Sequence, residues 1–176
     1  MLKRILIFIT LILAFLAVAI ARRPSHFHIE RSALIATSPE NVFKEVNDLH
    51  HWEARSPWAK MDPAAKTSYA GPKTGIGAGF SWAGNDKVGV GTMTITDSRK
   101  NEYIRFRLDF LKPMKGTNTA QFTFKPEGKS TIVTWSMDGE SNFVAKAFSL
   151  FINCDKMVGG QFEKGLMDLK VIAEAK

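Results

Sequence analysis

Apolar and polar residues alternate along much of the chain after residue 25, and this period of two predicts β-strands. The alternation is clearest within residues 102–110, where Ile104, Phe106 and Leu108 fall on one face. Arg105 and Arg107 fall on the other face, so one side of this strand is expected to be buried and the other exposed. The same reasoning places strands at residues 28–35, 66–70, 77–83, 87–97, 102–110, 117–125 and 130–138.

The last six of these segments are separated only by short turns. Glycine, proline or asparagine occurs in each connection, as at residues 71–72, 84–86 and 126–128. Strands that are joined by short turns, with no helix between them, pair in an antiparallel meander. The sequence therefore predicts an antiparallel sheet.

Two segments have the period of a helix instead. Residues 37–40 (Thr-Ser-Pro-Glu) are typical of a helix start, and a short apolar stripe follows them. The segment from Ser141 to about Ala175 predicts a single long helix, in which Gly159 and Gly160 are unfavourable unless another element approaches closely or the helix bends there. The apolar stripe of this helix consists of Phe143, Ala147, Leu150, Phe151, Cys154, Val158, Phe162, Leu166 and Leu169.

This order of elements predicts an α+β helix-grip fold, in which an antiparallel sheet wraps around the C-terminal helix. Such an arrangement leaves an apolar hollow between sheet and helix, and we expect the functional site there. Residues 50–63 follow no regular pattern and carry Trp52 and Trp58. We expect this irregular segment to act as a mobile lid over the hollow.

The N-terminal segment predicts a membrane span. Residues 5–21 contain no charge and are almost wholly apolar, with Lys3 and Arg4 before them and Arg22 and Arg23 after them. As a helix they reach about 25 Å, against a bilayer core of about 30 Å. This pattern favours an uncleaved single-pass anchor over residues 1–23. Its flanking charges are nearly balanced, and we place the domain of residues 24–176 outside the cytoplasm because of targeting habits and because no second apolar span follows.

The alternative is a signal segment that is cleaved, which leaves a secreted domain. Ala17 and Ala19, or Ala19 and Ala21, fit the small residues of a cleavage site. The four basic residues that flank the apolar segment contribute four positive charges to the net charge of +7. Lysine alternates with acidic residues in the C-terminal helix, so we expect no nucleic acid as a partner.

Few residues offer catalytic or metal-binding chemistry. The single cysteine, Cys154, excludes an internal disulfide and is expected to be a buried thiol in the long helix. The histidines lack the spacing of a metal site, so no metal and no cofactor is expected. The candidate acid–base groups are His50, His51, Glu53, Asp62 and Asp109, and no nucleophile or paired carboxylate accompanies them.

Three motifs carry a family resemblance: residues 38–43 (Ser-Pro-Glu-Asn-Val-Phe), the pair Trp52 and Trp58 with five residues between them, and residues 162–166 (Phe-Glu-Lys-Gly-Leu). With them, residues 26–174 resemble the polyketide cyclase/dehydrase-like branch of the START-like, birch-pollen-allergen-fold superfamily, also labelled SRPBCC. The resemblance implies a seven-stranded antiparallel sheet around a long C-terminal helix and a cavity for a hydrophobic molecule. Members range from lipid carriers to cyclases.

We therefore expect a non-catalytic domain, tethered to a membrane through residues 5–21, that binds a hydrophobic small molecule or lipid. Large aromatic side chains provide the flat apolar walls that such a cavity needs. The alternatives are a cyclase/dehydrase-type enzyme that acts on a hydrophobic substrate, and an interaction module whose groove accepts a segment of a partner. The expected ligand-binding residues are Trp52, Trp58, Trp82, Phe106, Phe110, Phe122, Trp135, Phe151 and Phe162.

Overall fold

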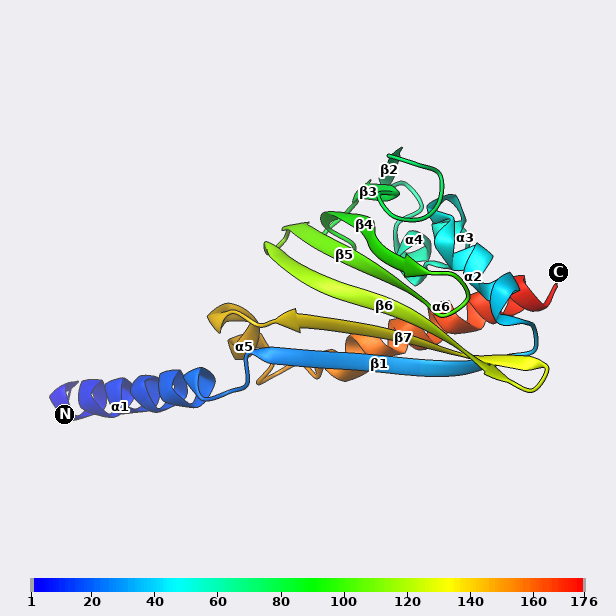
Figure 1. Ribbon diagram of the computed structural model, residues 1–176. Helices are drawn as coiled ribbons and strands as arrows, with labels where there is room; N and C mark the ends of the chain where they lie inside the picture. Colours follow the sequence, from blue (N-terminus) through cyan, green and yellow to red (C-terminus); the bar gives the residue numbers. More distant parts are fainter. Residues whose placement is uncertain (1, 176) are drawn as a thin grey trace.

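The computed structural model describes residues 2–175, which form a curved antiparallel sheet, a long helix across the sheet and a separate N-terminal helix (Figure 1). The helices are α1 (Leu2–Ala21), α2 (Pro39–Asn47), a 3₁₀ turn (Leu49–His51), α3 (Trp52–Arg55), α4 (Pro57–Met61), α5 (Phe143–Phe148) and α6 (Cys154–Glu174). The strands are β1 (His26–Ile35), β2 (Lys66–Ala70), β3 (Gly79–Ala83), β4 (Val90–Arg99), β5 (Tyr103–Lys112), β6 (Gly116–Glu127) and β7 (Ser130–Glu140).

The expected helix-grip fold is confirmed. The seven strands follow the order β1-β7-β6-β5-β4-β3-β2, and every neighbouring pair is antiparallel. The first strand therefore pairs with the last, and the other six form the predicted meander. The sheet curves around α6, which lies against β1 and β7 (Figure 1).

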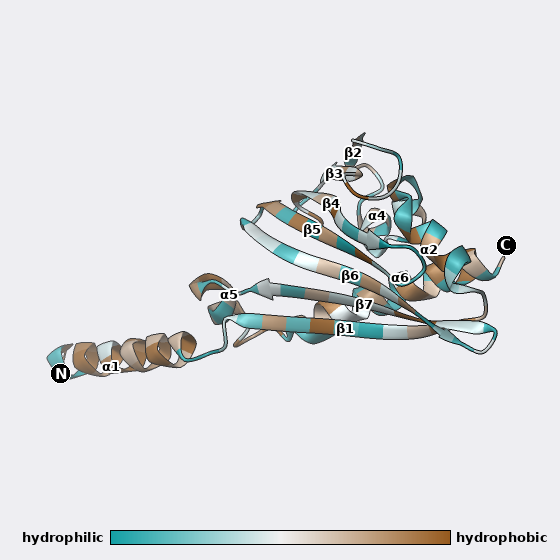
Figure 2. Cartoon of the chain, viewed as in Figure 1, coloured by the Kyte–Doolittle hydropathy of each residue, from teal (hydrophilic) through white to brown (hydrophobic). Residues whose placement is uncertain are grey.

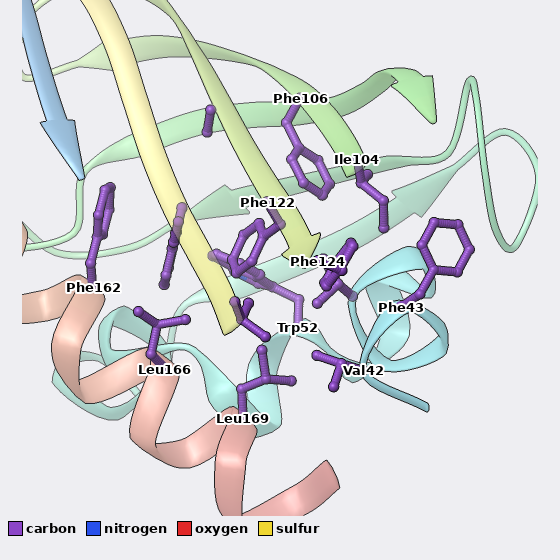
Figure 3. Packing of buried hydrophobic residues seen from close by; sticks show 14 of the residues in the cluster. Val42, Phe43, Trp52, Ile104, Phe106, Phe122, Phe124, Phe162, Leu166 and Leu169 are labelled. Carbon is purple, nitrogen blue, oxygen red and sulfur yellow. The ribbon is translucent and has the colours of Figure 1, made fainter. Parts of the chain in front are cut away.

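Alternate residues of the central strands form the core together with α6 (Figure 3). Phe106 of β5 and Phe122 of β6 point to the inner face and are almost fully buried. Phe162, Leu166 and Leu169, at helical spacing, meet them from α6. The alternation that predicted the strands therefore also predicted the buried face of the sheet correctly.

The short helix α2 closes the end of the sheet that lies farthest from α1 (Figure 1). It begins at Pro39, as predicted, because proline at the first helical position lacks an N–H that would have no helical partner anyway. Val42 and Val46 are fully buried, and the ring of Phe43 meets that of Phe124 of β6 edge-on, with centroids 5.8 Å apart. This end of the core is consequently filled with side chains.

The prediction of a single helix over residues 141–175 is wrong, because two helices occupy this segment. The side-chain carbonyl of Asn153 accepts a hydrogen bond from the backbone N–H of Lys156 at 2.9 Å, so a new helix, α6, starts there. The carbonyl of Asn142 caps α5 in the same way, with Ala145 as the donor at 2.8 Å. Two caps eleven residues apart favour a short helix and a break over one continuous helix.

The break changes the position of two predicted residues. Phe151 lies between α5 and α6 and is 87% exposed, so the expectation that it faces the hollow is wrong. Cys154 is also exposed, and the prediction of a buried thiol is wrong. The apolar stripe that suggested burial continues in sequence through the break, but the backbone turns these side chains away from the sheet.

The expectation of an irregular segment over residues 50–63 is also wrong. A 3₁₀ turn, α3 and α4 follow one another there. The hydroxyl of Ser56 accepts a hydrogen bond from the N–H of Ala59 at 3.4 Å, and Pro57 opens α4. Helices of three to five residues are too short to show a helical period in the sequence.

The N-terminal helix α1 is long and apolar enough to cross a membrane. Its 20 residues reach about 30 Å, which matches the thickness of a bilayer core. None of its residues is buried against the domain, and Figure 2 shows it as an apolar rod that projects from one end. A signal sequence has the same length and composition.

Glycine allows α6 to lie close to the sheet at two points. A Cβ atom on Gly159 would lie 2.2 Å from Nη2 of Arg31 in β1, so the predicted close approach occurs at this glycine. A Cβ atom on Gly165 would lie 2.7 Å from Cζ3 of Trp135 and 3.3 Å from Cδ of Pro57. Gly160, in contrast, faces open space.

We expect Gly165→Ala to lower the free energy of unfolding by about 1–3 kcal/mol, because the added methyl group forces α6 away from a rigid indole ring. Gly160→Ala is the matched control on the same helix. It should raise the free energy of unfolding by up to about 1 kcal/mol through helix propensity alone. Urea unfolding of the two variants measures the difference, and a Gly165→Ala protein as stable as wild type would contradict the proposed contact.

Candidate ligand-binding cavity

A cavity of about 230 Å³ lies between the inner face of the sheet, α6 and the segment from α3 to β2. All of the predicted ligand-binding residues except Phe151 line it, namely Trp52, Trp58, Trp82, Phe106, Phe110, Phe122, Trp135 and Phe162. Phe151 lies outside it for the reason given above. The folded chain thus brings together predicted residues from α3, α4, α6 and four strands.

Several lining residues were missed. Met93, Leu108, Ala120, Met137 and Val158 also form the wall. Leu108, Ala120 and Met137 share the inner face of their strands with predicted residues, and Met93 of β4 lies directly across from Leu108, so the period of two contained the signal that identifies them. Loop residues such as Pro63 and Val88 also line the cavity, and no periodic pattern marks loop positions.

Trp135 of β7 lies at the centre of an aromatic cluster in this wall. Its ring stacks on Phe162 of α6, with centroids 4.2 Å apart and an interplanar angle of 9°. On the sheet it stacks on Phe122 at 4.7 Å. The rings of Trp52 and Trp58 meet it edge-on at 5.6 Å and 5.9 Å. These contacts hold the indole in one orientation.

The indole N–H of Trp135 has no hydrogen-bond partner among residues 2–175, although the side chain is only 4% exposed. Trp82, also in the wall, differs in this respect, since its N–H donates to the carbonyl oxygen of Val88 at 3.1 Å. A buried donor without a partner costs about 1–3 kcal/mol. The Cζ3 edge of the Trp135 ring faces Gly165 of α6. The opposite edge of that ring, which bears Nε1, therefore points away from the helix contact.

Two carboxylates lie at the edge of the cavity, and both already accept hydrogen bonds. Asp62 accepts from the backbone N–H of Asn85 at 2.7 Å and of Ala64 at 3.3 Å, which joins the end of α4 to the turn before β4. Glu53 is exposed and accepts from the hydroxyl of Tyr69 at 2.8 Å. Burial and this hydrogen bond raise the pKa of Tyr69 to about 12, so the phenol remains protonated at neutral pH.

The expected acid–base set is not brought together. His50 lies outside the cavity, with Nδ1 2.9 Å from Asp48 and its ring stacked on Tyr69 at 4.1 Å. Nδ1 of His51 is 3.1 Å from Oε2 of Glu45. Each histidine therefore faces a buried carboxylate: His51 faces Glu45 of α2, and His50 faces Asp48, which caps the end of α2.

Asp109 also lies outside the cavity, on the outer face of β5 as expected. Its carboxylate accepts a hydrogen bond from the hydroxyl of Thr117 at 2.6 Å and pairs with Arg107. These two contacts lower the pKa of Asp109. Of the predicted acid–base candidates, only Glu53 and Asp62 reach the cavity.

A buried arginine, which sequence reasoning missed, holds the α3 wall in place. The guanidinium of Arg55 donates to the carbonyl oxygens of Glu45 at 2.7 Å and Val46 at 3.4 Å, near the C-terminal end of α2, where a positive charge is favourable. It lies over the ring of Trp52 at 5.2 Å. Burial lowers the pKa of Arg55 to about 10, which leaves it charged at neutral pH.

The histidines of β1 belong to an ion-pair cluster rather than to the cavity. Nδ1 of His28 lies 2.7 Å from Asp138, its cross-strand neighbour, and Nε2 lies 3.3 Å from Glu30. Nε2 of His26 is 3.6 Å from the same Asp138. Within residues 2–175, no group of three or more histidine, cysteine or acidic side chains is arranged to hold a metal ion.

Solved structures with the same fold share little sequence with this chain. CV1439 from Chromobacterium violaceum has a TM-score of 0.60 at 12% identity, over 84% of this chain and 96% of that protein. Mll3558 from Rhizobium loti has a TM-score of 0.60 at 17% identity, over 81% and 96%. The di-domain ARO/CYC protein StfQ of the steffimycin biosynthetic pathway has a TM-score of 0.63 at 12% identity, over 88% of this chain and 53% of StfQ. No curated protein matches the sequence significantly.

A seven-stranded sheet closed over an apolar cavity by a C-terminal helix defines a helix-grip protein, the fold also seen in Ara h 8.0201. The chain belongs to the family described as polyketide cyclase / dehydrase and lipid transport, whose model matches residues 26–174. The family resemblance found in the sequence is thereby confirmed. At these identities the solved structures establish the fold, and the family name covers both cyclisation and lipid transport.

The His28 cluster predicts a pH dependence of stability. Hydrogen bonds to Asp138 and Glu30 raise the pKa of His28 above its ordinary value of 6.5 in the folded protein. The stabilisation is therefore complete below the unfolded pKa and is lost as the pH rises through the folded pKa. We expect the stability advantage of wild type over His28→Gln to be present below pH 6.5 and to be lost as the pH rises through the raised pKa of His28, by less than about 1 kcal/mol because the ring is half-exposed.

The free energy of unfolding of both proteins, measured across this pH range, tests the expectation. The difference between the two curves at each pH cancels the contribution of groups that do not contact His28. A constant difference over the range would contradict the assignment.

Proposed function

We propose that this protein binds a hydrophobic small molecule or lipid in the cavity, without catalysis, while α1 tethers it to a membrane. The observation that carries the proposal is an apolar, aromatic-walled cavity whose lining includes Trp135, a residue with a buried indole N–H that has no partner among residues 2–175. Buried polar groups in native proteins are nearly always hydrogen-bonded. A ligand with a carbonyl, ester or hydroxyl oxygen at this position would supply the missing acceptor.

The size and lining of the cavity support a compact ligand or one segment of a longer molecule. A volume of about 230 Å³ is slightly below the range of about 300–1,000 Å³ typical of pockets for drug-sized ligands. Affinity would come from the burial of apolar surface, at about 25 cal/mol per Å². The charged side chains of the lining, Glu53 and Asp62, lie at its edge and are occupied by internal hydrogen bonds.

Entry to the cavity would involve the segment from α3 to α4. Trp52 and Trp58 form part of the wall, and the ammonium group of Lys60 at the end of this segment donates to Asp168 of α6 at 2.6 Å. Opening would break that surface ion pair, which is worth about 1 kcal/mol or less, and would also separate Trp52 and Trp58 from Trp135. This segment is thus our candidate for the lid.

Tethering through α1 would keep the cavity within reach of membrane lipids, and we place the domain outside the cytoplasm. The length and composition of α1 support an anchor, and basic residues flank it at both ends. A cleaved signal segment would instead give a secreted binding protein. Either case leaves the cavity unchanged, because α1 contributes no residue to it.

A cyclase/dehydrase-type activity is the second candidate, and one observation favours it. Glu53 lines the cavity and is hydrogen-bonded to Tyr69, so a carboxylate next to a phenol lies at the edge of an apolar site. General acid–base catalysis uses such groups. An enzyme of this kind would lose turnover in Glu53→Gln, whereas a carrier would keep its ligand.

Blocking the cavity tests the binding proposal. Val158 of α6 is half-buried in the cavity wall, and Val158→Trp would fill the space beside it. Val171→Trp makes the same chemical change on the same helix at a position that is 68% exposed and outside the cavity. We expect wild type and Val171→Trp to release a hydrophobic molecule on solvent extraction, and Val158→Trp to release much less.

Mass spectrometry of solvent extracts from the full chain in nanodiscs measures this release and identifies the molecule. Nanodisc lipids extracted from empty discs provide the background. Equal amounts from all three proteins would place the molecule outside the cavity, and no molecule above background in any of them would count against carriage.

The unpartnered indole predicts a chemical preference. 2-Acetylnaphthalene and 2-ethylnaphthalene have similar shapes, but only the first has a carbonyl acceptor. Trp135→Phe keeps an aromatic ring between Phe122 and Phe162 and removes the N–H. We expect this variant to bind the acetyl compound roughly 2- to 10-fold more weakly than wild type does, since one hydrogen bond is lost, and the ethyl compound about equally.

Titration of each compound against both proteins under one set of conditions measures the effect. Partition of the compounds into detergent affects both proteins alike, so the comparison between proteins remains valid. An equal loss for the two compounds would mean that Trp135 acts through packing alone.

A further inference from the structure

The end of the domain nearest α1 carries an exposed apolar surface. It is formed by α5, the break after it and the first turn of α6. We call it the α5 patch, and it consists of Phe143 (55% exposed), Val144 (51%), Phe148 (53%), Phe151 (87%), Ile152 (42%) and Met157 (55%). Large exposed apolar patches mark sites that bind a protein, a ligand or a membrane.

The α5 patch is held next to the end of α1. The guanidinium of Arg23, two residues after α1, donates to the carbonyl oxygen of Ser149 at 3.1 Å and to its hydroxyl at 3.0 Å. α1 and α5 are in contact, and Figure 1 shows α5 beside the point where the chain leaves α1. Residues 22–25 connect α1 to β1 and reach at most about 14 Å when extended.

This short connection determines what the α5 patch faces. If α1 crosses a bilayer, its last residue lies at the interface between lipid and water, and the α5 patch lies within one short linker of it. An apolar surface at that depth inserts into the boundary between headgroups and acyl chains. The apolar face of an interfacial helix reaches about 5–10 Å into this boundary. Figure 2 shows apolar residues on α5 close to the apolar rod of α1.

The charges around the α5 patch fit a membrane surface. Arg22, Arg23, Lys146 and Lys156 lie in or next to it, and basic residues at this level attract anionic headgroups. The neighbouring Asp155 is neutralised within the protein, because its carboxylate pairs with Arg31 at 2.9 Å. Glu140 at the end of β7 is also exposed near this surface, and the four basic residues outnumber these two acidic ones.

We propose that the α5 patch inserts into the bilayer interface beside α1 and fixes the domain on the membrane surface. This inference rests on the tethering in the proposed function. It extends that function, because α6 begins in the patch at Cys154 and reaches the cavity wall at Val158, one turn later. Insertion of the α5 patch would therefore bring one wall of the cavity, at Val158, to within one helical turn of the bilayer interface.

Quenching of a fluorophore at single positions tests the inference on the full chain. Cys154 is the single cysteine of the chain, so Cys154→Ser provides a background for new cysteines. Phe151→Cys places an NBD label in the α5 patch. Lys129→Cys places it in the exposed turn between β6 and β7, at the other end of the sheet, as a control (Figure 1). Phe8→Cys places it within α1.

The labelled proteins are reconstituted in nanodiscs of phosphatidylcholine and phosphatidylglycerol. Lipid with a doxyl group at carbon 5 of the acyl chain quenches labels in the interface, and iodide quenches labels in water. We expect doxyl lipid to quench the label at residue 151 at least several-fold more strongly than the label at residue 129, and iodide to give the reverse order. This result supports insertion of the patch.

The label in α1 separates the two ideas. Quenching by doxyl lipid at residue 8 with iodide access at residue 151 would keep the tether and overturn the insertion of the α5 patch. Doxyl quenching at residue 151 without quenching at residue 8 would support insertion and contradict the span. A label at residue 151 that neither reagent quenches would show that protein, such as a second copy, covers the patch, and this would overturn the proposal.

Discussion

The contact between α6 and the indole of Trp135 is the interaction on which the rest of the domain depends. Gly165 lets the helix backbone approach the ring edge, and Phe162, one turn earlier, stacks on the ring face. Phe122 holds the other face from the sheet. These contacts set the distance between α6 and the sheet at the position of Trp135. Beyond it, towards β3 and β4, the curvature of the sheet carries the strands away from α6, and the cavity lies in that space.

The same side chain links stability to function. An indole stacked on both faces contributes substantial apolar burial, but its N–H remains unpaired in the described part of the chain. Phenylalanine would stack equally well without a buried donor. Tryptophan is therefore a costly choice for packing alone, and the proposed ligand would remove this cost by supplying an acceptor. Local rules of packing and hydrogen bonding are most often broken at functional sites, where the surroundings hold the residue in place.

Much of the fold and most of the aromatic part of the cavity wall could be predicted from the sequence, because a period of two identifies both a strand and its buried face. Phe106 and Phe122 were found in this way, and Trp135 with them. The missed wall residues are of two kinds: Met93 and Leu108 carried the strand signal, whereas Pro63 and Val88 lie in loops without any period. The role of Arg55 was also beyond prediction, since a buried arginine depends on carbonyl groups that only the folded backbone brings together.

The errors at Phe151 and Cys154 have a common physical cause. A helical apolar stripe shows that one face avoids water, but it does not show whether protein or lipid covers that face. In α6 the stripe from Phe162 to Leu169 is covered by the sheet. Upstream of Asn153 the same period continues, but Phe143 and Phe151 are exposed there, at the end of the domain where an apolar helix also emerges. A stripe that appeared to extend the core can thus be explained as two surfaces of different kinds, one facing the sheet and the other facing the bilayer.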